Sequence, residues 1–208
     1  MIKRIEGSFI DWCREVVESD KYVVLDTETT GLKGEIIDLA IVDIQGNVLY
    51  DSLLSPACPI EAQATRVHHI DASMIIDSPC FAEAWISILE LIRGKSIIAY
   101  NAKFDSGRLA HTANAHNVTL PELTWHCAML EYAAFYGEPN RYGYFEPAWQ
   151  KLEEALAQQD ILLGPQQHRA LWDAQATAIL IRAIANLGEN AARYGWHDWH
   201  DVERDLMI

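Results

Sequence analysis

The chain has 208 residues, half of them hydrophobic, which is the length and apolar content of one ordinary domain with a substantial core. Its 16 Lys and Arg against 30 Asp and Glu give a formal net charge of −14, which argues against a protein that grips long duplex nucleic acid electrostatically. The same charge is compatible with an enzyme whose bound metal ions supply the positive charge at its site.

The first half of the chain predicts one helix followed by a run of strands. Ser8 precedes apolar residues at helical spacing, so a helix is expected over 8–19. Apolar and β-branched runs joined by short turns predict an antiparallel meander. Its strands are expected at 22–26, 35–43 and 48–54. Residues 65–71 are too polar for the core, and we expect them on the surface near the mouth of any site.

Helices alternate with one further strand in the second half. Apolar stripes predict helices over 81–93, 104–113, 125–136, 149–159 and 169–187, with a strand over 96–100. Trp149 to Leu152 are interpreted as core packing at a helix start. Strands first and helices interleaved later are typical of an α/β fold in which helices flank a mixed sheet.

Two acids directly follow the apolar run of the first strand. Side chains alternate along a strand, so Asp26 and Glu28 are expected to project side by side. Two carboxylates held this close repel each other unless a cation lies between them, and oxygen ligands favour Mg²⁺ or Mn²⁺ over Zn²⁺. An Asp-x-Glu tripeptide is common, however, so the prediction of a metal site depends on residues further along the chain.

Three later residues occupy places that a sheet could bring to the same edge. Asp105 lies in the first turn of a helix just beyond a strand, where ligands gather in α/β sheets and where the helix dipole stabilises a carboxylate. His168 precedes the last predicted helix and Asp173 lies inside it. A lone histidine at this place would be interpreted as a helix-start residue.

Three segments together resemble a known family. Residues 26–32, 101–105 and 168–174 are similar to the three motifs of the DEDDh branch of the DnaQ-like 3′→5′ exonucleases, which include the epsilon subunit of DNA polymerase III, RNase T and oligoribonuclease. The resemblance extends over about residues 20–185. It implies an RNase H-like fold and phosphodiester hydrolysis with two metal ions.

The resemblance also implies roles for individual residues. Asp26, Glu28, Asp105 and Asp173 would hold two Mg²⁺ or Mn²⁺ ions, and His168 would deprotonate the attacking water. Contacts with the 3′-terminal nucleotide are expected from Thr27, Thr29, Gly31, Leu32, His69, Asn101 and Phe104. His69 replaces a glycine that is frequent in the family, which puts the geometry of its loop in doubt. For Leu32, a wedge against the terminal base and ordinary packing both stay open.

The expected substrate is the 3′ end of single-stranded or frayed DNA, which would release nucleoside 5′-monophosphates. An exoribonuclease similar to RNase T stays open, since one sequence does not reveal tolerance for a 2′-hydroxyl. A non-catalytic interaction module is the alternative from another class, but such a module has no physical need for four clustered acids.

The ends of the chain and its cysteines complete the expectations. We expect an exonuclease domain over 1–187 and a tail over 188–208, in which Trp196 and Trp199 could dock a protein partner. A homodimer is left open. No apolar run approaches ~18 residues and no signal peptide is present, so a soluble, cytoplasmic protein with no membrane partner is expected. Four irregularly spaced cysteines predict reduced thiols rather than a zinc knuckle or a disulfide framework.

Overall fold

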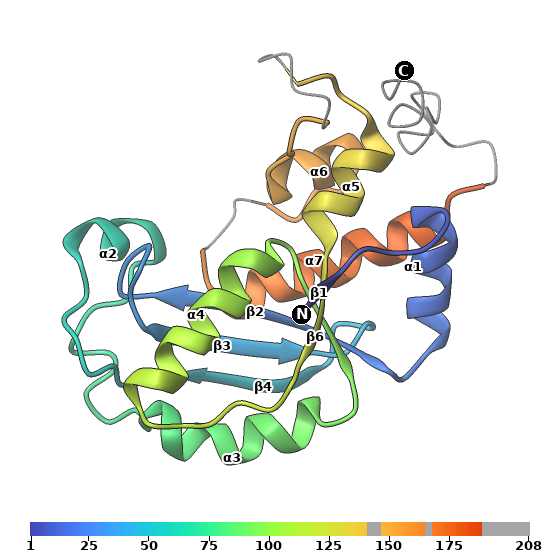
Figure 1. Ribbon diagram of the computed structural model, residues 1–208. Coiled ribbons are helices and arrows are strands. Elements are labelled where there is room, and N and C mark those ends of the chain that lie inside the picture. The colour runs from blue at the N-terminus through green and yellow to red at the C-terminus, as the bar shows by residue number, and fades with distance from the viewer. Residues whose placement is uncertain (141–146, 165–167, 189–208) are drawn as a thin grey trace, which may run out of the picture.

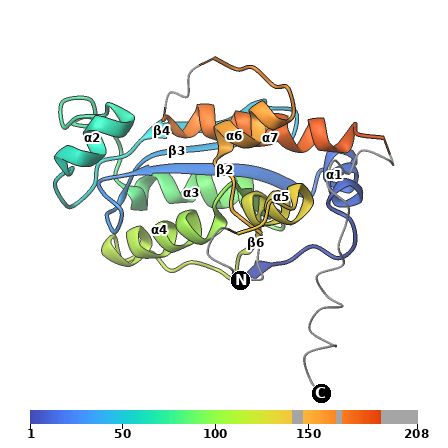
Figure 2. The ribbon, with the colours of Figure 1, turned by 90° about the horizontal axis from the view of Figure 1, so that it is seen from above.

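The structure is a computed structural model that describes residues 1–140, 147–164 and 168–188. Within these ranges a six-stranded sheet has the order β1-β6-β5-β2-β3-β4, and helices lie on both of its faces (Figures 1 and 2). The strands are β1 (Ile2–Lys3), β2 (Tyr22–Thr29), β3 (Ile36–Val42), β4 (Val48–Leu53), β5 (Ser96–Ala99) and β6 (Thr124–Cys127). The helices are α1 (Phe9–Glu18), α2 (Ala62–His68), α3 (Phe81–Ile92), α4 (Ala102–Ala115), α5 (Ala128–Tyr136), α6 (Leu152–Gln158) and α7 (Ala170–Ala185).

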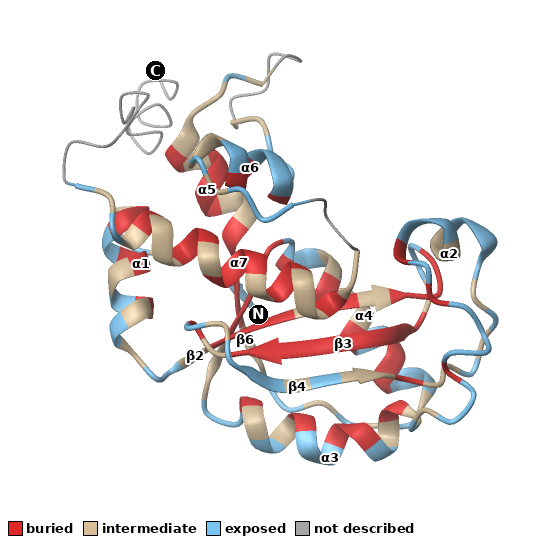
Figure 3. Ribbon diagram, turned by 180° about the vertical axis from the view of Figure 1, so that it is seen from behind, coloured by how far each residue is buried: buried red, intermediate tan, exposed pale blue. Residues whose placement is uncertain are grey.

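The sheet is mixed, as the sequence predicted. β2, β3 and β4 form the expected antiparallel meander, whereas β5 runs parallel to β2, and β6 lies parallel to both β5 and β1. Every residue of β3 is buried, because helices cover both faces of the sheet there, while β4 at the edge is largely exposed or half-buried (Figure 3).

Strand alternation separates the apolar residues into two cores. Val24, Val42 and Ile98 pack with α1, α5, α6 and α7 on one face of the sheet. Leu25, Ile41 and their neighbours pack with α3 and α4 on the other face. The row of side chains on β2 that includes Val24 therefore points toward α7, and this row sets the direction of the acids that follow it.

Two predictions for the middle of the chain were wrong in detail. The segment expected as one helix over 125–136 begins with β6, whose Trp125 pairs with Ile97 of β5 and with Ile2 of β1. A short apolar run does not distinguish a strand from a helix by its periodicity, and β1, with two residues, is too short to leave a pattern. The polar segment expected on the surface near the site instead ends helix α2, and it contains the buried residues His68 and Ile70.

A third prediction, for residues 149–152, was also wrong in detail. The helix expected from residue 149 begins at Leu152, and Trp149, interpreted as core packing, is 63% exposed. Trp196 and Trp199, the expected docking residues, lie outside the described residues. Among the described helices, none combines the length and apolar content needed to cross a membrane.

Candidate active site

β2 extends beyond its parallel neighbour, and this difference in length creates the site. Pairing between the two strands joins residues 22–24 of β2 to residues 96–98 of β5. β5 ends at Ala99, whereas β2 continues to Thr29. Asp26 to Thr29 therefore border a space beyond the end of β5, where α4 begins. In open α/β sheets this is the position at which ligands bind.

A cleft of about 460 Å³ occupies this space. Its volume is within the range of roughly 300–1,000 Å³ that is usual for ligand sites. The cleft contains all five predicted catalytic residues and three of the predicted substrate residues. These eight are Asp26, Glu28, Asp105, His168, Asp173, Thr27, Asn101 and Phe104. The sequence prediction did not include the other six lining residues, which are Tyr100, Met129, Trp149, Gln150, Lys151 and Leu152.

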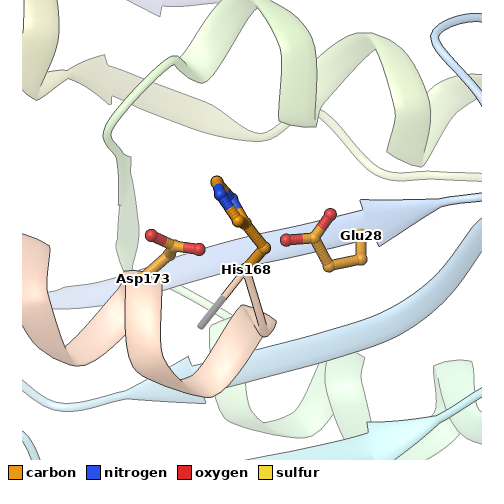
Figure 4. Close-up of side chains that lie close together, drawn as sticks. All are labelled: Glu28, His168 and Asp173. Carbon is orange, nitrogen blue, oxygen red and sulfur yellow. The ribbon is translucent and has the colours of Figure 1, made fainter. Parts of the chain in front are cut away.

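Three potential metal ligands converge in the cleft from two elements. Glu28 projects from β2, Asp173 lies in the first turn of α7, and His168 lies just before that helix; their side chains point toward one another (Figure 4). One ligand atom of each lies within 4.8 Å of the others. His168 adopts a left-handed backbone conformation with φ of +47°, which is uncommon for a residue other than glycine. The structure thus brings these three predicted residues together, and the roles predicted for them stay predictions.

Asp105 reaches the same cleft from the first turn of α4. It is 3% exposed, and its Oδ1 accepts a hydrogen bond of 2.8 Å from the Thr27 hydroxyl. Thr27 points to the opposite face of β2 from Asp26 and Glu28, toward α4. The structure therefore gives Thr27 a contact with Asp105, and its predicted contact with substrate stays a prediction.

The acids of the cleft have strongly perturbed pKa values. Burial raises the pKa of Asp26 well above its usual range, and the neighbouring Asp105 and Asp173 carboxylates raise it further. Burial and repulsion from the neighbouring Asp173 and Asp38 carboxylates raise the pKa of Glu28 to about 8. Burial raises the pKa of Asp105 to about 7, against the opposing hydrogen bond from Thr27. Clustered acids that hold protons near neutral pH favour exchange of those protons for a cation.

The donor set fits divalent metal ions. Four carboxylates supply oxygen ligands, which suit Mg²⁺ and Mn²⁺. Lys151 is the only Lys or Arg among the fourteen residues that line the cleft. Arg169 lies close enough to lower the pKa of Glu28, but its guanidinium is paired with Asp38, so the described chain supplies little positive charge to neutralise the four acids.

A second pair of residues fixes the start of α7 against the sheet. Asp38 of β3 lies opposite Glu28 in the strand register and is fully buried. Its Oδ2 accepts a hydrogen bond of 2.7 Å from Arg169 Nε and one of 3.3 Å from the Ala170 amide. The sequence reasoning did not identify this pair, although an acid inside the apolar run of β3 was a signal for it.

The predicted nucleotide loop lies beside the cleft. The Thr29 hydroxyl donates to the Gly31 carbonyl at 2.8 Å, and the Gly34 amide closes a turn onto the same carbonyl at 2.8 Å. A Cβ at Gly31 would collide with the Glu61 carboxylate, so glycine permits this approach. Leu32 at the tip of the turn is 82% exposed. Neither Thr29, Gly31 nor Leu32 lines the cleft, and their substrate contacts stay predictions.

His69 is not brought into the cleft. It caps the C-terminus of α2 in a left-handed conformation with φ of +59°, and it is exposed. Its neighbour His68 is buried, and the His68 Nδ1 accepts a hydrogen bond of 3.0 Å from the Ile70 amide. The sequence raised a doubt about the geometry of this loop because His69 replaces a glycine. In the structure His69 does adopt a backbone conformation that glycine adopts more readily.

Comparison with known proteins agrees with this geometry. A family model described as Exonuclease (RNase_T) matches residues 23–181. The uncharacterized exonuclease CP81 of Escherichia phage 186 is 30% identical over 177 residues, which are 81% of this chain and 90% of the phage protein. The DNA polymerase III epsilon subunit of Buchnera aphidicola is 29% identical over 124 residues, which are 54% of this chain and 51% of that subunit.

Solved structures share the same fold. Exonuclease X in complex with 5′ overhanging duplex DNA has a TM-score of 0.56 and 27% identity, over 79% of this chain and 91% of that chain. The Mg²⁺ and Mn²⁺ bound form of Pop2p from S. pombe has a TM-score of 0.54 and 14% identity, over 85% and 88% of the two chains. The fold and the site define a hydrolytic 3′ exonuclease with an RNase H-like fold. The chain belongs to the Exonuclease family, in its DnaQ-like DEDDh branch.

Proposed function

We propose that this chain removes nucleoside 5′-monophosphates one at a time from the 3′ ends of single-stranded or frayed DNA, with two divalent metal ions as cofactors. The single observation that carries the proposal is the convergence of Asp26, Glu28, Asp105, Asp173 and His168 in one cleft. Four partly or fully buried acids repel one another, and a fold that keeps them together without a cation sacrifices stability. Pop2p of S. pombe, a protein of similar fold, was solved with Mg²⁺ and Mn²⁺ bound.

Each acid has a place in this proposal. The Asp26 carboxylate interacts electrostatically with those of Asp105, Asp173 and Glu28, and it would therefore be shared between the two metal positions. Glu28 and Asp173 would hold one ion, and Asp105 would support the other. Bound there, divalent ions activate a water nucleophile and stabilise the charge that develops on the phosphate and on the departing 3′ oxygen.

His168 would remove the proton from the attacking water. Its imidazole lies on the cleft wall beside Glu28 and Asp173, within reach of a group bound between them. General bases of this kind contribute roughly 10²–10⁴-fold to a rate. The hydrogen bonds that Asp38 accepts from Arg169 and from the Ala170 amide fix the residues that follow His168. They therefore restrict where its ring can lie.

Two observations support an unpaired end as substrate. The net charge of −14 opposes binding along extended duplex. Leu32 is almost fully exposed at the tip of a turn closed by hydrogen bonds. An apolar side chain displayed in this way could separate a terminal base from its neighbour.

DNA is favoured over RNA because Exonuclease X was solved with DNA and the epsilon relative belongs to a DNA polymerase.

Digestion of matched oligonucleotides tests the proposal. Single-stranded DNA and RNA of the same sequence, labelled at the 5′ end, would be incubated with the protein in Mg²⁺ and separated on a denaturing gel, with Asp26→Asn as control. We expect a descending ladder on DNA that depends on Asp26. Equal or faster decay of RNA would replace the substrate assignment with an exoribonuclease. Absence of a ladder on both would contradict the proposed activity.

A further inference from the structure

One wall of the cleft is formed by residues 149–152, to which the proposed chemistry assigns nothing. Trp149 and Lys151 of this segment line the cleft together with the four acids. Trp149 is 63% exposed, and the Lys151 side chain is 75% exposed. Among the described residues, the Lys151 ammonium has one ion-pair contact, 3.9 Å from Glu153, which is long for a stable surface pair. Both side chains are thus available to a ligand in the cleft.

The backbone around Trp149 is anchored on both sides. The Ala148 amide donates to the Glu138 carbonyl at 2.8 Å. The side-chain amide of Gln150, itself 5% exposed, donates to the Glu138 carboxylate at 2.9 Å, and the Tyr100 hydroxyl donates to the Gln150 carbonyl at 2.7 Å. Because Gln150 points inward, the residues on either side of it are left facing the cleft. Trp149 is therefore displayed by a fixed backbone.

Trp149 differs from the other described tryptophans. Trp12, Trp85 and Trp125 are each less than 10% exposed, and Trp172 is half-buried. Leaving a large aromatic side chain in water forgoes the free energy of its burial. An indole that is exposed specifically at a ligand cleft is expected to bury its face against that ligand. The alternative of a core residue, expected from the sequence, is excluded by its exposure.

We propose that Trp149 is a stacking platform for an unpaired nucleobase of the substrate strand, and that Lys151 contacts a phosphate of the same strand. The inference rests on the proposed function and adds a second binding position to it. Every base presents a π face, so stacking tolerates any sequence and either sugar. A base inside a duplex is already stacked on both faces and is not available. Lys151 also offsets the repulsion between the strand and the acids of the cleft.

Binding and kinetic measurements with matched variants test this inference. Anisotropy of a 5′-fluorescein oligothymidylate in Mg²⁺ would be measured in an Asp26→Asn background, which removes hydrolysis. Trp149→Ala should weaken binding roughly 5- to 100-fold, and Trp149→Phe should restore most of that loss. Lys151→Ala should reduce the slope of log affinity against log salt by about 0.7, whereas Trp149→Ala should leave that slope unchanged. In the active chain Trp149→Ala should raise KM by a similar factor with kcat changed less than about twofold.

Controls separate a local contact from a general effect. Ile86→Ala removes an exposed apolar side chain from α3, and Lys21→Ala removes an exposed charge just before β2, at the opposite end of that strand from the acids. Neither should change affinity or KM. Quenching of tryptophan fluorescence by unlabelled oligothymidylate gives a direct signature of stacking. It should be largely lost in Trp149→Phe, although that variant still binds.

The outcomes distinguish this inference from the proposed function. Normal hydrolysis by the unaltered chain, together with unchanged affinity and KM in Trp149→Ala, would overturn the inference and leave the exonuclease proposal standing. Full quenching in Trp149→Phe would also overturn it. If the unaltered chain neither binds nor hydrolyses any oligonucleotide, the proposed function fails and this inference fails with it. Should Trp149→Ala unfold, Trp149→Phe and Lys151→Ala decide the matter.

Discussion

Asp38 and Arg169 form an ion pair in which a fully buried carboxylate of β3 holds the residue that precedes α7, with 2.7 Å between Oδ2 and Nε. Arg169 is the N-cap of α7 and makes no cap hydrogen bond with its own side chain. Asp38, from a distant strand, supplies the acceptor for the Ala170 amide instead. The helix that carries Asp173 and follows His168 is thus attached to the strand directly opposite Glu28.

Removing Arg169 should reduce the free energy of unfolding more than replacing Asp38. Arg169→Ala leaves a buried carboxylate without its cation, and we expect a loss of roughly 1–3 kcal/mol in the free energy of unfolding, since Arg169 is itself partly exposed. Asp38→Asn keeps an acceptor and frees Arg169 to reach water, so a smaller loss is expected. Both should lower kcat at least about tenfold with little change in KM. Chemical denaturation and steady-state kinetics measure this.

Asp11→Asn is the matched control for that prediction. It removes an ion pair with Arg14 at 3.2 Å in which the Asp11 side chain is 71% exposed. Such surface pairs contribute little, and we expect a change below about 0.5 kcal/mol. A loss for Asp38→Asn that exceeds the loss for Arg169→Ala would contradict the predicted order of the two effects, and an unchanged kcat in both variants would refute the anchoring role given to Asp38.

His168→Ala should separate proton transfer from metal binding. We expect turnover to fall by roughly 10²–10⁴-fold, because the water loses its base. The increase in Tm that Mg²⁺ produces should be largely retained, since the four carboxylates remain. Single-turnover rates and thermal melts give the two readouts. A near-normal rate would remove His168 from the role of base, and loss of the Mg²⁺ response would reassign it as an indispensable ligand.

The metal-free protein should lose stability as pH rises through the neutral range. The ordinary pKa of Glu28 is 4.5 and its folded value is about 8, while Asp105 changes from 3.8 to about 7. At pH values between the unfolded and folded pKa of each carboxyl, the folded state binds more protons than the unfolded chain. The free energy of unfolding therefore falls with increasing pH. We expect Tm in a chelator to fall by several degrees from pH 6 to pH 8.5. The fall should be smaller in Glu28→Gln, and a rise in Tm over this range would contradict the electrostatic account.

Mg²⁺ should raise Tm, and more at pH 8 than at pH 6. The ion binds only the folded site and relieves the repulsion among the acids, so it stabilises the folded state by mass action. At lower pH the ion must displace protons from Glu28 and Asp105, which weakens its binding. Scanning fluorimetry with increasing Mg²⁺ at both pH values measures this. An equal or larger increase at pH 6 would argue against metal binding by these carboxylates.

Much of the fold could be predicted because its signals are local, whereas the five candidate catalytic residues were assigned together through the family resemblance. For example, the alternation of side chains along a strand is enough to predict that Asp26 and Glu28 point to the same face of the sheet. The Asp38–Arg169 pair could not be predicted in the same way, because it joins residues 131 positions apart. The role of Trp149 was missed for a similar reason. Its exposure depends on how Gln150 is hydrogen-bonded to Glu138 and Gln158, which no periodicity reveals.

The most direct test of the central claim is anomalous diffraction from crystals grown with Mn²⁺ and thymidine 5′-monophosphate. The account predicts two Mn²⁺ peaks in the cleft, one held by Glu28 and Asp173 and one supported by Asp105, with Asp26 contacting both and His168 beside the nucleotide phosphate. A single peak would refute the two-metal proposal. Peaks located away from these carboxylates, with the nucleotide bound elsewhere, would contradict the assignment of this cleft as the active site.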